Sequence, residues 1–192
     1  MTKVSLDDHS GPWSEEEFLA LDATNYRLEL LDGSLWVTPR PIAPHQDISG
    51  HLYVALLPAA KAAGLRVRQD VDVRLATARI LQPDLIISKG ERVVTVTKAS
   101  DVLLACEITS PSNAAMDRIT KKELYAAANI KWYLLIEPET SRYESVTLHL
   151  FRLEAGRYQT YAVAEGNKVL TLEEPLRATI NGNSLLGLED SL

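Results

Sequence analysis

The 192-residue chain predicts an α/β (α+β) fold in which a mixed β-sheet is flanked by helices, with an N-terminal hairpin and a C-terminal β-hairpin. Three observations favour this class. Short continuous apolar runs are typical of strands covered on both faces, and other segments alternate apolar with polar residues as half-buried strands do. Apolar residues recur three or four positions apart in a few stretches long enough for helices. The length favours a single domain over residues 1–192, with its core at about 14–163.

The N-terminal part of the chain predicts a short helix followed by a hairpin. Residues 14–17 (SEEE) fit a capping box, and we expect the helix that they begin to run to about Asp22. Residues 26–31 and 34–38 alternate apolar and polar side chains. The dipeptide Asp32-Gly33 between them tolerates the positive φ angles of a tight turn, so the two strands should pair.

A long amphipathic helix and several strands make up the rest of the chain. Apolar residues recur at helical spacing from Ile48 to Ala63, and Gly64 favours a helix end there. Residues 65–75 alternate as one half-buried strand, whereas three later runs have continuous apolar centres and predict buried strands. Those runs are residues 81–88, 101–108 and 131–138, with a helix at 114–128 and a β-hairpin at 146–163.

Net charge argues at first against nucleic acid as a partner. The chain carries 20 Lys and Arg against 26 Asp and Glu, a formal net charge of −6. The acidic residues gather at the ends, with 8 acids and 2 bases in residues 1–32 and 5 acids and 2 bases in residues 165–192. Residues 33–164 hold 16 bases and 13 acids, so a local nucleic-acid surface is compatible with the composition.

Cysteine content and the lack of a targeting signal predict the compartment. Cys106 is the single cysteine, so the chain cannot form an internal disulfide or a cysteine-rich zinc site. The acidic start does not resemble a signal peptide, and no apolar stretch reaches the roughly 18 residues of a membrane span. We therefore expect a cytoplasmic protein without a membrane partner.

Two carboxylates stand at the ends of the predicted buried strands. Asp84 directly precedes Leu85, and Glu107 follows the apolar run that ends at Cys106. If these strands are antiparallel neighbours, the start of one lies beside the end of the other, and both carboxylates meet at one edge of the sheet. Mg²⁺ takes one or two carboxylates together with water and phosphate oxygens, so this edge is a candidate metal site. The alternative is that each charge only marks a strand end at the surface.

The helix at 114–128 brings further polar groups toward this edge. On a helical wheel its core stripe is predicted to be apolar, while a polar stripe spaced by four residues lies at the border of that stripe. A lysine in the polar stripe can reach Glu107; the alternative is a solvated i,i+4 ion pair. The apolar stripe is Met116, Ile119, Leu124 and Ala127, and the polar stripe is Asp117, Lys121 and Tyr125.

The order of three motifs, QPDLII, CEITSPS and DRITKKELY, resembles the Uma-two family, small bacterial proteins of the PD-(D/E)XK nuclease superfamily that have long been catalogued as a domain of unknown function. The segment YRLELLDGSLWVTPRPIAPH is similar to the opening hairpin of that family, and the resemblance covers roughly residues 14–160. The matching residues are Pro83-Asp84, Glu107, Ser110, Pro111, Ser112, Asp117, Lys121 and Tyr125, with Glu29 and His45 upstream.

The resemblance implies a restriction-endonuclease-like fold and a metal-dependent hydrolytic site. Asp84 and Glu107 would hold Mg²⁺ or Mn²⁺ with help from the backbone carbonyl of Ile108, and Lys121 would orient the attacking water. In the parent superfamily a lysine stands two residues after the second acid, where this chain has Thr109. The resemblance therefore implies that the lysine function has moved to Lys121 on the helix.

Several other side chains are candidates for supporting roles. Glu29 could add an acidic ligand if its hairpin packs over the site, although strand alternation alone is equally compatible with an outward position. His45 could contact phosphate or transfer protons, but a histidine in a first helical turn is more often a surface or packing residue. Asp117 could position Lys121. Trp36 is expected to pack on the hairpin rather than to stack on bases.

We therefore expect a Mg²⁺-dependent endonuclease that hydrolyses DNA and forms a homodimer, because two symmetric sites most simply cut two strands. One alternative is a nuclease-fold protein that binds nucleic acid or a protein partner without cleavage, and another is a metal-dependent phosphodiesterase for small substrates. The expected phosphate contacts are Arg66, Arg68, Arg74, Arg79, Lys89, Arg92 and Lys98.

Overall fold

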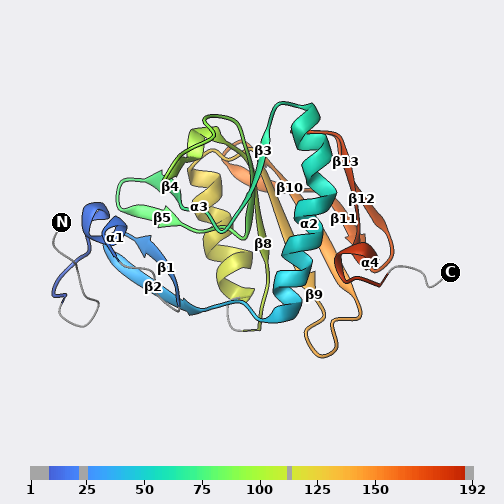
Figure 1. Ribbon diagram of the computed structural model, residues 1–192, viewed down its shortest axis with the longest axis horizontal. Coiled ribbons are helices and arrows are strands. Elements are labelled where there is room, and N and C mark those ends of the chain that lie inside the picture. The colour runs from blue at the N-terminus through green and yellow to red at the C-terminus, as the bar shows by residue number, and fades with distance from the viewer. Residues whose placement is uncertain (1–8, 22–25, 112–113, 189–192) are drawn as a thin grey trace.

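The computed structural model describes residues 9–21, 26–111 and 114–188, and it contains two mixed sheets, a two-stranded hairpin and helices on both faces of the larger sheet (Figure 1). This arrangement confirms the predicted class. In the described part of the chain, no helix has the length and apolar character that crossing a membrane requires.

The larger sheet has six strands in the order β11-β10-β9-β8-β6-β3. All neighbouring pairs are antiparallel except β8 and β9, which run parallel and are joined by a helical crossover. The strands are β3 (Arg66–Gln69), β6 (Leu85–Ser88), β8 (Val102–Ile108), β9 (Trp132–Pro138), β10 (Val146–Glu154) and β11 (Arg157–Glu165).

The helices that cover the two faces of this sheet are α2 and the crossover helix. Helix α2 (Ala43–Ala62) packs its apolar stripe against one face, and a 3-10 turn, η1 (Ala99–Asp101), precedes β8. The crossover begins as a π-helical segment, η2 (Met116–Lys121), and continues as α3 (Lys122–Ala127). In Figure 1, α2 and α3 lie on opposite sides of β8.

The second sheet has the order β2-β1-β5-β4-β7 and carries the predicted N-terminal hairpin. Asp32 (φ +49°) and Gly33 (φ +82°) form the turn, as the Asp-Gly dipeptide predicts. The strands are β1 (Tyr26–Leu31), β2 (Ser34–Pro39), β4 (Val73–Ala76), β5 (Arg79–Leu81) and β7 (Thr97–Lys98).

Helix α1 (Glu15–Leu19) precedes this sheet and has the predicted capping box. The Ser14 hydroxyl accepts from the Glu17 amide at 3.2 Å, and the Glu17 carboxylate accepts from the Ser14 amide at 2.9 Å. The helix ends at Leu19, earlier than expected, and Asp22 lies outside the described residues.

The expectation of one continuous strand over residues 65–75 is wrong. Asp70 takes a left-handed backbone conformation (φ +49°), so the chain turns there and leaves the larger sheet. The part before the turn is β3, which pairs with β6, and the part after it is β4, which pairs with β5. Alternation alone cannot distinguish two short strands in different sheets from one long strand.

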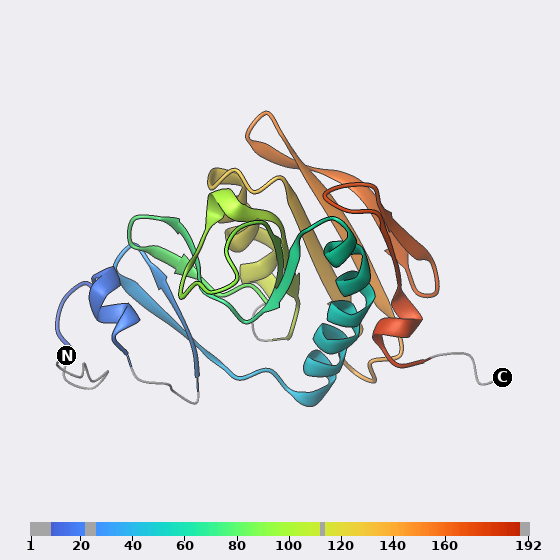
Figure 2. The ribbon, with the colours of Figure 1, turned by 45° about the horizontal axis from the view of Figure 1, so that its top comes forward.

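Residues beyond 163 extend the core past its predicted boundary. Strands β12 (Val169–Leu172) and β13 (Ala178–Asn181) form a hairpin, and α4 (Gly182–Leu185) follows it. Figure 2 shows this module beside α2. The buried side chains that it adds to the α2 face are Leu170, Leu172, Leu176, Ile180 and Leu185.

Candidate active site

The register of β6 and β8 brings Asp84 and Glu107 to the same edge of the larger sheet. The two strands are antiparallel, and Leu85 lies opposite Cys106. Asp84 therefore stands at the start of one strand where Glu107 ends the other, as the sequence predicts. Both carboxylates are buried, with 2% and 1% of their residues' surface exposed. Asp84 Oδ2 also accepts a hydrogen bond from the Ile108 amide at 2.7 Å.

Lys121 reaches this edge from the crossover helix. Its ammonium nitrogen Nζ lies 3.1 Å from Glu107 Oε1, 3.0 Å from Glu29 Oε1 and 3.8 Å from Asp117 Oδ1. Glu107 Oε1 also accepts a hydrogen bond from the Tyr125 hydroxyl at 2.5 Å. Lys121 and Tyr125 of the predicted stripe thus meet at the Glu107 carboxylate, and Asp117 lies beside Lys121.

The predicted core face of this helix is wrong. Ile119 is 60% exposed and Ala127 is exposed, whereas Asp117, Lys121 and Tyr125 are buried. Met116 and Leu124, the other members of the predicted stripe, are only partly buried. The first half of the helix faces the buried carboxylates, so Asp117 and Lys121 turn inward, while Leu124 and Tyr125 in its second half pack on an apolar cluster. The π-helical turn over Met116–Lys121 changes the spacing between successive turns and is a feature often found at functional sites.

Strand β1 places Glu29 against the same lysine. Glu29 is 2% exposed, and its Oε1 also accepts a hydrogen bond from the Gln82 amide at 2.8 Å. The hairpin therefore packs over the site, which was one of the two possibilities left open by strand alternation. Thr109 is buried and its amide donates to the Ile136 carbonyl, so it has a backbone role while Lys121 provides the cation.

His45 lies in the first turn of α2 and points at Asp84. Its Nε2 is 3.2 Å from Asp84 Oδ2, and the residue is 6% exposed. Its other ring nitrogen, Nδ1, has no hydrogen-bond partner among the described residues. The position is thus neither on the surface nor a simple packing position, because the ring contacts a candidate metal ligand. Of the Ser-Pro-Ser motif, Ser112 lies outside the described residues.

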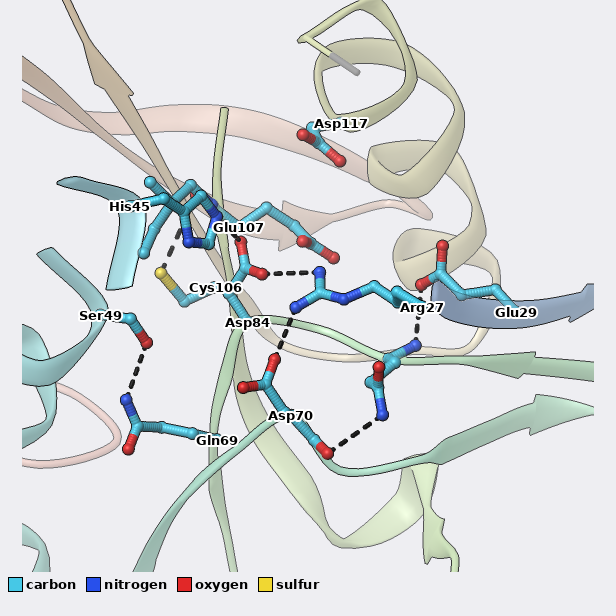
Figure 3. Close-up of polar contacts among 12 residues, drawn as sticks. Arg27, Glu29, His45, Ser49, Gln69, Asp70, Asp84, Cys106, Glu107 and Asp117 are labelled. Atoms are coloured by element: carbon cyan, nitrogen blue, oxygen red, sulfur yellow. Dashed lines mark hydrogen bonds and ion pairs between the residues drawn. The ribbon is translucent and has the colours of Figure 1, made fainter. Parts of the chain in front are cut away.

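Arg27 is a site residue that the sequence analysis missed. Its guanidinium lies between Asp84 and Asp70, with Nη1 2.7 Å from Asp84 Oδ1 and Nη2 2.5 Å from Asp70 Oδ1 (Figure 3). The residue is 9% exposed. One signal for it was present in the sequence: Arg27 and Glu29 are two positions apart on β1, so they share a face of the hairpin.

Burial and charge set the protonation states at the site. Burial would raise the pKa of Asp84, but the hydrogen bond from His45 and the charge of Arg27 together hold it well below its ordinary value. Burial raises the pKa of Glu107, which Lys121 only partly offsets, and burial raises the pKa of Asp117 to about 7. The surrounding carboxylates outweigh desolvation at Lys121 and raise its pKa. Lys121 therefore stays charged, while Asp117 changes its protonation state near neutral pH.

Four of the predicted phosphate contacts are engaged within the protein. Arg66 donates to the Gly90 carbonyl, and Arg68 donates to the Thr97 hydroxyl and to the Glu91 carbonyl. Both side chains thus hold the loop that precedes β7. Two further ion pairs join Arg74 to Glu15 at 2.8 Å and Arg79 to Asp32 at 2.7 Å. The remaining three candidates, Lys89, Arg92 and Lys98, are exposed.

Comparison with known proteins places this geometry in a family. No curated protein matches the chain. A crystal structure of a "putative nuclease belonging to DUF820" from Anabaena variabilis has the same fold, with a TM-score of 0.72 and 16% identity over 92% of this chain and 99% of that chain. The family model "Uma2: Putative restriction endonuclease" matches residues 15–185. The chain belongs to the Uma2 family.

Proposed function

We propose that this protein is a metal-dependent endonuclease that hydrolyses phosphodiester bonds in DNA. The observation that carries the proposal is the buried convergence of Asp84, Glu107 and Lys121 from a loop, a strand and a helix. Burying charges costs free energy, and an apolar cluster of similar volume would stabilise the fold at least as well. A catalytic role would explain why the charged residues are buried together, and the description of the family as restriction endonucleases agrees with such a role.

The residues at this edge fit a divalent cation in donor type and in charge. The described residues contain no group of three or more His, Cys, Asp or Glu side chains placed to hold a metal ion. Mg²⁺ needs only one or two carboxylates and fills its other positions with water and phosphate oxygens. Asp84 and Glu107, with the Ile108 carbonyl, would be its protein ligands. Burial raises the pKa of Glu107 and of Asp117, and the neighbouring carboxylates raise both further, so an added positive charge would favour their ionised forms.

Each side chain of the site then has a defined task. When bound, a divalent cation would neutralise phosphate charge and lower the pKa of a coordinated water. Lys121 would orient that water and stabilise the charge that develops on the phosphoryl oxygens. Tyr125, whose pKa burial raises well above the ordinary value, stays protonated and fixes the Glu107 carboxylate by donating to it. His45 fixes the Asp84 carboxylate in the same way, and Glu29 and Asp117 bracket Lys121.

A second candidate function is a nuclease-fold protein that binds nucleic acid without cutting it. One observation favours this alternative: Asp84 and Glu107 are already paired with Arg27 and Lys121. A nicking assay distinguishes the two candidates.

For the first candidate, cleavage of both strands of a duplex would require two sites, which a symmetric homodimer would supply.

The test is incubation of supercoiled plasmid with the purified protein and Mg²⁺ or Mn²⁺. We expect the wild type to nick the plasmid and both Asp84→Asn and Lys121→Ala to lose roughly 100-fold or more, because each removes a group that acts in the transition state. Lys168→Ala removes a lysine from an exposed turn and is the matched control. Nicking that survives both site substitutions contradicts the assignment. Plasmid binding by the wild type without nicking supports the second candidate.

A further inference from the structure

A small pocket opens beside Lys121, between the N-terminal hairpin and the crossover helix. Its volume is about 330 Å³, at the lower end of the roughly 300–1,000 Å³ that small-ligand sites occupy. It combines acidic and basic side chains with an indole and a thioether. The pocket is lined by Arg27, Glu29, Leu35, Trp36, Val37, Thr38, Met116, Asp117 and Lys121.

Strand register turns Trp36 toward the candidate active site. Trp36 lies directly opposite Glu29 in the antiparallel pair of β1 and β2. Directly opposed residues of an antiparallel pair project from the same face of the sheet. Because the Glu29 carboxylate on that face is 3.0 Å from the Lys121 ammonium, Trp36 belongs to the wall that faces the site.

Trp36 lies on the hairpin but outside the hydrophobic core. It is absent from all three hydrophobic clusters of the described residues. Trp132 belongs to the main cluster, and Trp13 packs against the cluster around Phe18. Trp36 is only partly buried and has no aromatic ring partner in the described part of the chain. A partly exposed indole outside the core, in the wall of a pocket, can offer a ring face to a ligand.

The charge distribution leaves few basic side chains free to bind phosphate, so nucleic-acid binding needs another source of affinity. The formal net charge of the chain is −6, and four of its seven predicted phosphate contacts already bind protein groups. Phosphate contacts give most of the affinity of non-specific nucleic-acid binding, so a protein with few free ones needs another source. Stacking of bases on aromatic side chains is such a source, because every base has a π face.

We propose that Trp36 and this pocket form a nucleobase subsite, in which an unpaired base stacks on the indole next to the phosphodiester that is to be cut. The inference rests on the proposed function and names its substrate class. Bases inside an intact duplex already stack on their neighbours, so only a single-stranded or extruded nucleotide can present a free face to Trp36. The protein therefore acts on nucleic acid that is unpaired at the cleaved position.

Binding of labelled oligonucleotides tests the subsite without requiring cleavage. In EDTA and low salt, fluorescence anisotropy compares a dT12 oligonucleotide with a 12-mer in which the central four nucleotides are abasic. We expect Trp36→Ala to weaken binding of dT12 about tenfold, Trp36→Phe to retain most of it, and the abasic oligonucleotide to bind wild type as weakly as dT12 binds Trp36→Ala. Tyr161→Ala, which removes a 46% exposed ring from the edge strand β11, is the control and should bind as wild type does.

The outcomes of this experiment are independent of the nicking assay. Equal binding of the two oligonucleotides by wild type, or unchanged dT12 binding by Trp36→Ala, overturns the subsite even if the protein nicks plasmid. Base-dependent binding through Trp36 in a protein that cuts neither plasmid nor dT12 in the presence of Mg²⁺ or Mn²⁺ supports the subsite and contradicts only the proposed cleavage. Thermal unfolding of Trp36→Ala and Trp36→Phe shows whether either variant is folded, and the abasic oligonucleotide distinguishes stacking on a base from a lost packing contact, because it leaves the protein unchanged.

Discussion

The Lys121 ammonium lies 3.1 Å from Glu107 Oε1 in a location where both residues are at least 98% buried. The same nitrogen is 3.0 Å from Glu29, so one cation serves two buried carboxylates from different sheets. The crossover helix, the larger sheet and the N-terminal hairpin are thereby joined through a single side chain. Loss of that charge should affect folding as well as any chemistry.

Lys121→Met should destabilise the protein by about 3–5 kcal/mol, because it leaves buried carboxylates without their counter-ion. Adding Glu107→Gln removes one of those carboxylates, so the double variant should cost less than the sum of the single variants by roughly 0.5–3 kcal/mol. Urea unfolding at pH 7 in EDTA measures all three, with Lys168→Met as the exposed control. Strict additivity would show that the two groups do not interact.

Asp117 should make stability fall as the pH rises between about 4 and 7. Its pKa is raised from 3.8 to about 7, chiefly by burial, so in this range the folded state binds a proton that the unfolded state has lost. The proton on Asp117 stabilises the folded state fully when the pH is below the pKa of 3.8 in the unfolded chain. This stabilisation is lost as the pH rises through the folded-state pKa of about 7. Asp117→Asn should therefore flatten the dependence of the urea midpoint on pH between 4.5 and 7.5. Parallel curves for wild type and variant would refute this assignment.

Substitution of Gly182 by a residue with a side chain should destabilise the protein, because a Cβ there would lie 2.3 Å from the Gly166 carbonyl oxygen and 2.8 Å from Val146 Cγ1. We expect Gly182→Ala to cost about 1–3 kcal/mol, the usual range for overpacking. Gly50→Ala is the matched control, since it lies within α2 and its Cβ would meet nothing within 4 Å. That control should stabilise the protein by roughly 0.5–1 kcal/mol, as Ala does in helices. Thermal melts that show equal effects would refute the close packing of α4 on the β11–β12 turn.

Much of the site was predictable because it depends on local chain geometry. Asp84 precedes β6 and Glu107 lies near the end of β8, so the antiparallel pairing of these two successive strands of the larger sheet brings the carboxylates together. The spacing of Asp117, Lys121 and Tyr125 likewise places them on one helix face. Hydrophobic periodicity predicts the wrong buried face for the first half of this helix, because it assumes an apolar partner and cannot anticipate the carboxylates around Lys121.

Other features depend on long-range packing that no local pattern reveals. Arg27 and His45 reach Asp84 from β1 and α2. Strand alternation places Arg27 on the same face as Glu29, but it does not show that this face meets Asp84. The β12–β13 hairpin was hidden because its strands have four residues each, too few for a clear alternation. Its apolar side chains were assigned to an acidic end of the chain rather than to the core.

Arg27 should compete with a divalent cation for Asp84. Its guanidinium lies 2.7 Å from Asp84 Oδ1, and its charge helps to hold the pKa of that carboxyl low. Arg27→Gln should lower stability in EDTA by roughly 3 kcal/mol, because it removes the guanidinium that pairs with the buried Asp84 carboxylate and leaves only His45 and the Ile108 amide beside it. Added Mg²⁺ can take the place of the lost charge, so it should raise the melting temperature of this variant more than that of wild type. Arg79→Gln is the control, since that exposed pair with Asp32 should matter little and should leave the Mg²⁺ response unchanged. Equal Mg²⁺ responses in wild type and Arg27→Gln would show that the arginine does not occupy the position of a metal ion.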